Sequence, residues 1–328
     1  MSKKQTFEEE LAEAKSTIPT IEGFTLVTCV AAQVRASYRK TDQKQLSIIL
    51  QFPDNYPEQP VVIELTSKTL SDKLLNGMMK LCDDEIKKYI GKSQVLPVMR
   101  FVREFMINNP LCVCNDEIAT VKKDLLNDED KIKLKQDTSQ IIMKIVQERY
   151  NMNLKITVPD LYPSQQVQIE AAESNFPDIL KVFFVGQAVE IARKCVQPPG
   201  KPNTKGPPFK PRPSLLEVCS FLIKDCVKRY PLESCAVCTE RVLLEDPEGV
   251  TKDPRKRVER VYCGHLYHHG CLAKYMKTPP FKDGKFCPTC GKQIFHDKWK
   301  VSAELAEARW AHKQARQREL AEVTDFLS

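Results

Sequence analysis

The sequence predicts an α+β protein built from two copies of one small domain, followed by a cysteine- and histidine-rich module and a C-terminal helix. Three observations predict this fold class. A segment of fourteen residues recurs 106 positions later in the chain, from residue 51 to residue 157. Strand-like alternation precedes each copy and helical periodicity follows it. Six cysteines and two histidines then occur in close pairs between residues 235 and 290.

Length and composition favour a soluble protein with several domains. The 328 residues exceed what one hydrophobic core usually organises, so two or three domains are expected. No apolar run approaches the roughly 20 residues that span a bilayer, and residues 1–11 are charged, so neither a membrane span nor a signal sequence is expected. Seven of the thirteen cysteines lack paired spacing, which favours a reducing compartment and predicts a cytoplasmic or nuclear location.

The formal charge of +7 is modest for this length and partly local. A solvated loop is the commoner explanation of such a basic run, so nucleic acid is not expected as a partner and stays an alternative. The basic residues concerned are Lys252, Arg255, Lys256, Arg257 and Arg260.

The repeat covers residues 51–64 and 157–170, which agree at eight of fourteen positions without a gap. Residues 46–52 and 152–158 alternate between apolar and polar side chains and predict a strand before each copy. The Pro-Asp-x-Tyr-Pro sequence within each copy fixes two φ angles and removes two amide donors, which is typical of a rigid turn. Repeats of this kind indicate a duplicated structural unit.

Helices are predicted on both sides of these strands because the apolar period there changes to about three and a half. In the first copy we expect helices over residues 7–16, 70–90 and 97–107, and in the second over 115–127, 176–195 and 214–230. Residues 198–213 contain seven prolines and predict a stiff loop insertion, with a proline-motif ligand as the alternative.

A helix, a meander of strands, a Tyr-Pro turn and two helices make an α+β sandwich with one covered sheet face. This arrangement resembles the RWD domain, a relative of the ubiquitin-conjugating fold, whose signature is represented here by Tyr56, Pro57 and Pro60. The second copy keeps Tyr162 and Pro163 but has Gln166 in place of the later proline.

The resemblance does not extend to conjugating activity. A conjugating enzyme needs a nucleophilic thiolate beside an asparagine that stabilises the oxyanion. Cys82 lies on an apolar-periodic helix without a preceding His-Pro-Asn sequence, which predicts a buried core thiol. Cys112 and Cys114 lack redox spacing and an adjacent histidine, so we interpret them as structural.

Eight metal-ligating side chains occur in four pairs between residues 235 and 290, enough for two tetrahedral zinc sites. Intervals of 24, 2 and 15 residues separate consecutive pairs. The short second interval favours an interleaved brace, in which the first and third pairs hold one ion. The first site is then Cys235, Cys238, His268 and Cys271, and the second is Cys263, His265, Cys287 and Cys290.

His269 is an alternative to His268, but His268 leaves the two-residue gap that allows it to share an ion with Cys271. Each site has three thiolates and one neutral imidazole, a net charge of about −1 with zinc bound. Neither site keeps an open position for water, so two structural Zn²⁺ ions are expected.

This ligand order resembles the RING finger of the H2 type, which implies an E3 ubiquitin ligase. Such a ligase binds a ubiquitin-charged conjugating enzyme (E2) and positions its thioester for attack by a substrate lysine, without a covalent intermediate on the ligase. The resemblance places the E2-binding groove at Val237, Tyr275 and Pro288. Active RING fingers often carry Arg or Lys after the last ligand, where this chain has Gly291. Gly291 favours the alternative of a non-catalytic, zinc-stabilised scaffold.

Residues 297–328 contain no proline or glycine and predict a closing helix, with some apolar surface from Trp299, Leu305 and Trp310. The expected domains are RWD domain 1 (1–110), RWD domain 2 (111–232), the RING finger (233–296) and this helix. Their order resembles that of the Fanconi anaemia L-subunit ligases. We expect the RWD domains to recruit a protein substrate or complex.

Overall fold

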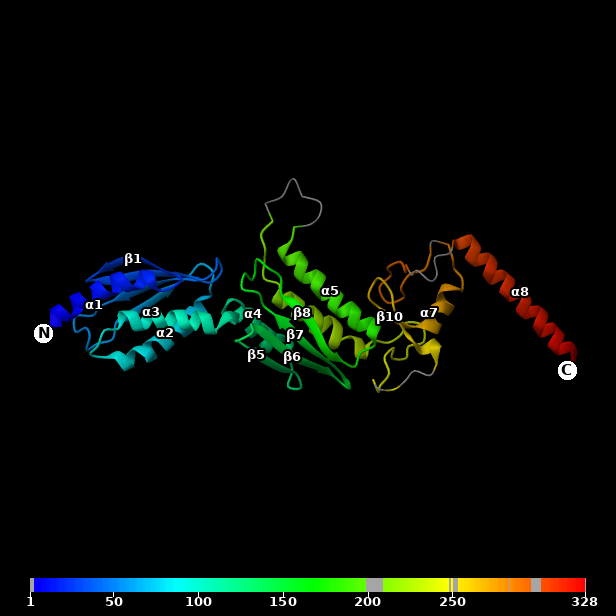
Figure 1. Cartoon of the computed structure of the whole chain (residues 1–328). Helices are drawn as coiled ribbons and strands as arrows, with labels where there is room; N and C mark the ends of the chain where they lie inside the picture. Colours follow the sequence, from blue (N-terminus) through cyan, green and yellow to red (C-terminus); the bar gives the residue numbers. More distant parts are fainter. Residues whose placement is uncertain are drawn as a thin grey trace. The chain divides into compact units, whose positions relative to one another are not determined.

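The computed structural model describes residues 3–198, 209–247, 249, 253–282, 284–295 and 302–327 (Figure 1). Its contacts group the chain into two compact units. The first unit comprises Met1–Ile145, Asn153–Glu173 and Val182–Ile223, and the second comprises Val146–Met152, Ser174–Lys181 and Lys224–Ser328. The proline-rich residues 199–208 and the predicted helix residues 297–301, including Trp299, lie outside the described part of the chain.

The first domain has the predicted order of a helix, a meander of strands and two helices. Its four strands form an antiparallel meander in the order β1-β2-β3-β4. Helix α2 packs against β4 and α3, and α1 contacts β1 and α3. The elements are α1 (Lys3–Thr17), β1 (Phe24–Val30), β2 (Gln33–Arg39), β3 (Gln45–Gln51), β4 (Val62–Thr66), α2 (Asp72–Ile86) and α3 (Val95–Asn108).

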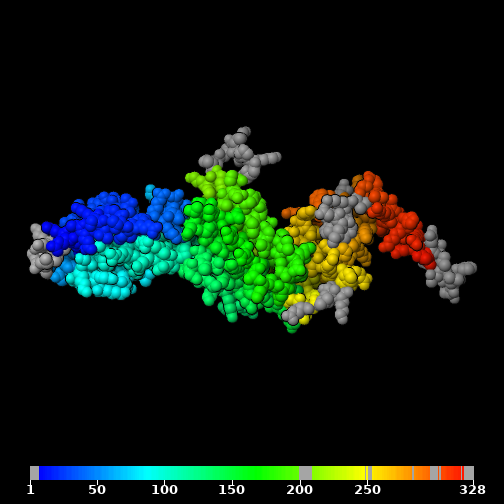
Figure 2. Space-filling view, in the orientation of Figure 1, coloured from blue at the N-terminus to red at the C-terminus, as the bar shows by residue number. Residues whose placement is uncertain are grey.

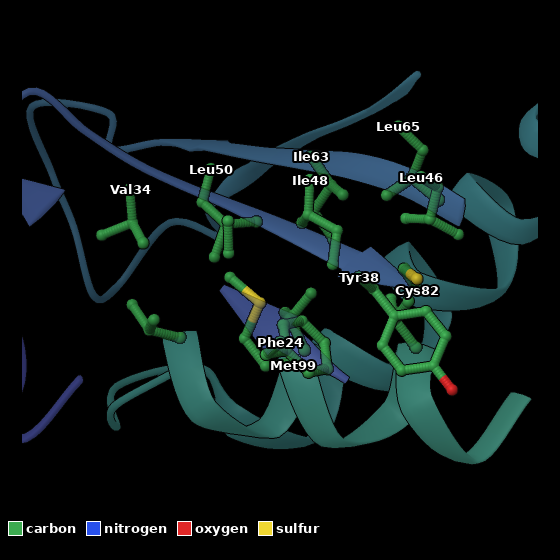
Figure 3. Close-up of a cluster of buried hydrophobic side chains, with 14 of the residues drawn as sticks. Phe24, Val34, Tyr38, Leu46, Ile48, Leu50, Ile63, Leu65, Cys82 and Met99 are labelled. Atoms are coloured by element: carbon green, nitrogen blue, oxygen red, sulfur yellow. The ribbon is translucent and has the colours of Figure 1, made fainter. Parts of the chain in front are cut away.

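Alternation along the strands builds the core of this domain. Leu46, Ile48 and Leu50 of β3 are buried, whereas the residues between them are not. Because successive strand side chains point to opposite faces, these three line the side that the helices cover. Figure 3 shows Ile48 and Leu50 facing Met99 of α3. The predicted strand over residues 46–52 is thus confirmed as β3.

The helix predicted over residues 70–90 is shorter in the structure. It begins at Asp72, where the Ser71 hydroxyl accepts a hydrogen bond from the Leu74 amide and caps the first turn. It ends at Ile86 and tightens into the 3₁₀ turn Lys87–Tyr89 before Gly91, whose φ of 79° ends the helical path.

The second domain repeats this order of elements. Its strands form a second meander in the order β5-β6-β7-β8. The strand predicted over residues 152–158 is β7, which begins two residues earlier and ends one residue earlier. The elements are α4 (Asn115–Thr120), β5 (Lys131–Lys135), β6 (Gln140–Gln147), β7 (Tyr150–Thr157), β8 (Gln168–Ser174), α5 (Asp178–Val196) and α6 (Leu215–Ser220).

Two predicted helices of this domain change pitch before they end. The helix over 115–127 continues from α4 as the π-helical segment Val121–Leu125, and the helix over 214–230 continues from α6 as Phe221–Val227. In the latter, the neighbours Leu222 and Ile223 are both fully buried. A π-helical turn contains more residues than an α-helical turn, so the regular helical period predicted for these segments stops before the helices end.

In both domains, hydrogen bonds join the Tyr-Pro turn to the first helix of the domain and to the start of its third helix. In the first, the Tyr56 hydroxyl donates to the Glu10 carboxylate of α1 at 2.8 Å and accepts from the Gln94 amide at 3.0 Å, just before α3. In the second, the Tyr162 hydroxyl donates to Glu117 of α4 at 2.5 Å and accepts from the Ser214 amide at 2.8 Å, just before α6. The repeat therefore preserves a buried hydrogen-bond network as well as the order of elements.

The C-terminal part contains a small sheet and two helices. Strands β9 (Val258–Arg260) and β10 (Leu266–His268) pair antiparallel, α7 spans His269–Met276, and α8 spans Ala303–Leu327. The predicted C-terminal helix is thus confirmed as α8, and Figure 2 shows its coloured part, in red, at the surface. Among the described residues, none of the helices combines the length and apolarity needed to cross a membrane.

Candidate metal centre

Four predicted ligands from two distant pairs meet in the first cluster. The ligand atoms of Cys235, Cys238, His268 and Cys271 all lie within 4.8 Å of one another. His268 ends β10 and Cys271 lies in the first turn of α7, so the strand-to-helix junction positions the third pair. Such a set of thiols and an imidazole could hold one metal ion.

The second cluster is made by the other two pairs. The ligand atoms of Cys263, His265, Cys287 and Cys290 also lie within 4.8 Å of one another. The chain thus alternates between the clusters, because its first and third pairs share one and its second and fourth share the other. This is the interleaved arrangement that the spacing predicts.

The distances within the clusters fit a tetrahedral zinc ion. Bonds of about 2.3 Å to sulfur and about 2.1 Å to nitrogen hold the two ligand atoms about 3.6 Å apart. Nδ1 of His268 lies 3.2 Å from Sγ of Cys238 and 3.9 Å from Sγ of Cys271. Nδ1 of His265 lies 3.4 Å from Sγ of Cys263 and 3.6 Å from Sγ of Cys287. Both clusters therefore have room for one such ion each.

The first and last cysteine pairs lie in turns of the same form. The Thr239 amide donates to the Cys235 carbonyl at 2.7 Å, and the Gly291 amide donates to the Cys287 carbonyl at 2.8 Å. Thr239 and Gly291 both have left-handed backbones, with φ of 65° and 68°. We call these two turns the knuckles (235–239 and 287–291). Gly291 therefore occupies a position that favours glycine for conformational reasons.

The surroundings of His268 fix which of its nitrogens can bind a metal. Its Nε2 lies 3.1 Å from the backbone carbonyl of Arg241 and can only donate there. The proton is thus held on Nε2, and Nδ1 is left as the free lone pair that faces the cysteines. His269, the alternative ligand, instead places Nδ1 2.8 Å from the carboxylate of Glu259.

Three thiols of the clusters have strongly perturbed pKa values. Burial, followed by the neighbouring thiols, raises the pKa of Cys271 to about 12, and burial raises that of Cys263 to about 11. Burial also acts against ionisation of Cys287, but the Tyr267 hydroxyl and nearby backbone amides lower its pKa to about 7. Closely packed thiolates repel one another, and a bound divalent cation removes that repulsion.

Sequence patterns alone did not identify two residues that support the clusters. Tyr267 is fully buried, and its hydroxyl lies 2.9 Å from Sγ of Cys287. Lys285 is also buried; its ammonium donates to the Thr278 carbonyl at 2.5 Å and lies 4.8 Å from the centre of the Tyr275 ring. Burial lowers the pKa of Lys285. Tyr267 lies between the ligands His265 and His268 in the sequence, and this position is the signal that could have identified it.

The three residues proposed for E2 binding occupy the knuckles and α7. Val237 is 37% exposed, and Pro288 is exposed on the other knuckle. Tyr275 is half-buried, and its hydroxyl donates to the Phe286 carbonyl at 2.8 Å. Tyr275 is thus held against the segment that precedes Cys287, while Val237 and Pro288 remain accessible to a partner.

The remaining cysteines are core residues. Cys82 is 1% exposed, and burial raises its pKa to about 12, so the thiolate of a conjugating enzyme is absent at neutral pH. Cys112 and Cys114 are buried as well, and burial is the main cause that raises the pKa of both. The prediction that these three are structural is confirmed.

Acidic side chains face the basic residues of the loop. The Arg255 guanidinium lies 3.2 Å from Asp253, Lys256 lies 3.4 Å from Glu240, and Arg257 lies 3.5 Å from the buried Glu259. These contacts favour the loop interpretation over a free basic patch. Lys252 and His296 lie outside the described residues.

Comparison with known proteins identifies the first domain. Residues 4–106 match the RWD domain. The E3 ubiquitin-protein ligase DTX1 of Mus musculus is 34% identical over 132 residues, which cover 32% of this chain and 21% of that protein; the Homo sapiens protein gives the same values. The E3 ubiquitin-protein ligase trul-1 of Caenorhabditis elegans is 28% identical over 61 residues, covering 19% of this chain and 10% of that protein. The matches thus span about a fifth or less of these relatives.

Proposed function

We propose that this protein is an E3 ubiquitin ligase of the RING-H2 type. The interleaving of the two Cys/His clusters carries the proposal, because it is the arrangement of a cross-brace. The RWD domain over residues 4–106 and the resemblance to proteins named E3 ubiquitin-protein ligases support it. Zinc is the proposed metal, since the thiol-rich, closed donor sets suit it.

The second domain is proposed to be a second RWD domain. Its order of elements and its Tyr162–Glu117 network, which match those of the first domain, support this assignment. The proposed domain limits are 1–110 and 111–232 for the RWD pair, 233–296 for the RING finger and 297–328 for the C-terminal helix. A cytoplasmic or nuclear location is proposed with this function.

The proposed reaction is transfer of ubiquitin from a charged E2 to a lysine of a bound substrate. The exposed knuckle residues Val237 and Pro288, together with Tyr275, form the E2 contact. Zinc would hold the knuckles in one geometry, so this surface is fixed before the E2 arrives. The ligase contributes position and orientation, and the thioester passes directly to the substrate amine. The RWD pair binds the substrate or its complex.

A discharge assay tests the proposal. The full chain is mixed with a panel of ubiquitin-charged E2 enzymes, and loss of the thioester to free lysine is followed with time. We expect acceleration with at least one E2, and about a tenfold loss of this acceleration for Val237→Ala, because few interface residues carry most binding energy. Leu232→Ala is the matched control, since Leu232 is 49% exposed but lies outside the knuckles. No acceleration with any E2, or equal loss in both variants, would contradict the proposal.

A non-catalytic scaffold is the second candidate, and Gly291 is the observation that favours it. In active RING fingers a cationic side chain at this position often bridges ubiquitin and the E2. Here the left-handed backbone, with φ of 68°, carries no side chain. On this alternative the zinc module binds a partner without discharging an E2. The same assay separates the two candidates.

A further inference from the structure

Helix α5 exposes an apolar face that the corresponding helix of the first domain does not have. Its buried side carries Leu180, Phe184 and Ala188, which are fully covered. On its other side Val182 is 74%, Ile179 48% and Val189 37% exposed. A helix that covers a sheet normally presents polar residues on its outer side.

The internal repeat provides a direct comparison for this face. The offset of 106 residues that relates the two Tyr-Pro turns also aligns α2 with α5, and it places the buried Met78 and Cys82 on the buried Phe184 and Ala188. At that offset four exposed positions of α2 that are polar or charged become apolar or glycine in α5. The aligned pairs are Lys73 with Ile179, Asn76 with Val182, Lys80 with Gly186 and Asp83 with Val189.

The exposed face of α5 is complementary to itself. Val182 is the most exposed large apolar side chain of α5 and lies one turn from Gly186, where an added Cβ would meet no atom within 4 Å. The face therefore has a protruding valine and, one turn away, a position without a side chain, which we call the notch. In an antiparallel pair centred on residue 184, Val182 of each copy faces Gly186 of the other. The same centre places Ile179 of one copy opposite Val189 of the other, because each of these residues lies five positions from residue 184.

The charges at the helix ends favour the antiparallel orientation. The first turn of α5 carries Asp178, and the last turn carries Arg193 and Lys194. Each end also has an internal pair, Lys181 with Asp178 and Glu190 with Arg193. An antiparallel pair brings the acidic first turn near the basic last turn and opposes the helix dipoles, whereas a parallel pair would place cations beside cations.

We propose that α5 is a self-association surface, through which two copies of this chain pair in antiparallel fashion with Val182 seated at Gly186. The interface is isologous, so a single patch supplies both sides. Its few exposed side chains fall short of the roughly 800 Å² per partner typical of stable complexes, so the dimer is weak and forms at high local concentration. This proposal does not depend on ubiquitin transfer.

Sedimentation velocity of the zinc-loaded full chain, over about two decades of concentration, tests the proposal. We expect the weight-average mass of the wild type to rise toward that of a dimer. Val182→Asp should weaken association at least about tenfold, because it buries an unpaired carboxylate in the interface. Asn76→Asp is the matched control; it adds the same charge at the equivalent exposed position of α2 and should leave association unchanged.

A second variant distinguishes specific packing of Val182 at the notch from nonspecific association of an apolar surface. Gly186→Leu fills the notch while replacing a helical glycine by a strong helix former, so the melting temperature should rise while dimerisation is lost. A merely sticky apolar patch would associate more strongly in this variant. A wild-type chain that stays monomeric throughout the concentration range would overturn the proposal and would indicate that the face binds another protein. Unimpaired association of Val182→Asp, or equal loss in Asn76→Asp, would also overturn it.

Discussion

Replacing Tyr162 by phenylalanine should release the start of α6 without unfolding the chain. The Tyr162 hydroxyl donates to the Glu117 carboxylate at 2.5 Å and accepts the amides of Ser214 and Leu215 at 2.8 and 3.1 Å. Phenylalanine fills nearly the same volume, so the apolar packing of this 1% exposed side chain is retained. The variant therefore isolates the hydrogen bonds.

The free-energy cost of the substitution follows from the polar groups that lose the Tyr162 hydroxyl as a hydrogen-bond partner. A hydrogen bond to a charged acceptor contributes about 1.5–3 kcal/mol, and a buried amide without a partner costs about 1–3 kcal/mol. Glu117 still binds the Leu216 amide at 3.0 Å, which limits the loss. We therefore expect local opening to become easier by about 3 kcal/mol, or roughly a hundredfold in the opening equilibrium.

Hydrogen exchange read by mass spectrometry on peptides covering residues 214–220 measures this change. Tyr150→Phe is the control; it removes a single neutral bond to the Leu244 carbonyl and should leave these peptides unchanged. Tyr56→Phe should produce the matching change at Gln94, whose amide binds the Tyr56 hydroxyl. Less than about a threefold change in the Tyr162 variant, or uniform acceleration over the whole chain, would refute the reasoning.

Three further predictions concern single side chains. Cys82→Ser should cost about 1–3 kcal/mol of stability by burying a hydroxyl, and it should leave ubiquitin transfer intact; a thioester on Cys82 in a non-reducing gel would contradict this. Gly291→Arg should raise E2 discharge relative to Gly291→Ala, since both carry the same left-handed backbone cost of about 1–2 kcal/mol and only Arg adds a cation; equal rates would count against the cationic bridge. Burial raises the pKa of Glu117 in the folded state, so its contribution to stability is greatest below the unfolded pKa and is lost as the pH rises through the folded value. Urea melts between pH 4 and pH 8 should therefore show a loss of stability with rising pH that is smaller in Glu117→Gln, and identical profiles would contradict this.

Local sequence patterns were sufficient for much of the fold. Apolar alternation located β3 within one residue, and the 3.6-residue period located α2 and α5. The ends of helices were harder to locate, because they depend on local geometry. The cap at Ser71 and the left-handed Gly91 shorten the first of these helices, and the pitch changes to that of a π-helix after α6.

The metal ligands were readable from the sequence because pairs at short spacing are local. Their surroundings were not, since the Arg241 carbonyl that orients His268 lies 27 residues away. The Tyr162 network joins residues about 45 to 53 positions apart, and no spacing rule predicts it. The exposed face of α5 was likewise hidden, because an apolar residue on a helix is ordinarily assigned to the core.

Cadmium-113 NMR of the metal-exchanged chain tests the interleaved brace most directly. The chain should bind two ions, and the ion that couples to the ring protons of His268 should also couple to the β-protons of Cys235 and Cys238. Coupling of the His268 ion to Cys287 and Cys290, or uptake of fewer than two ions, would contradict the account.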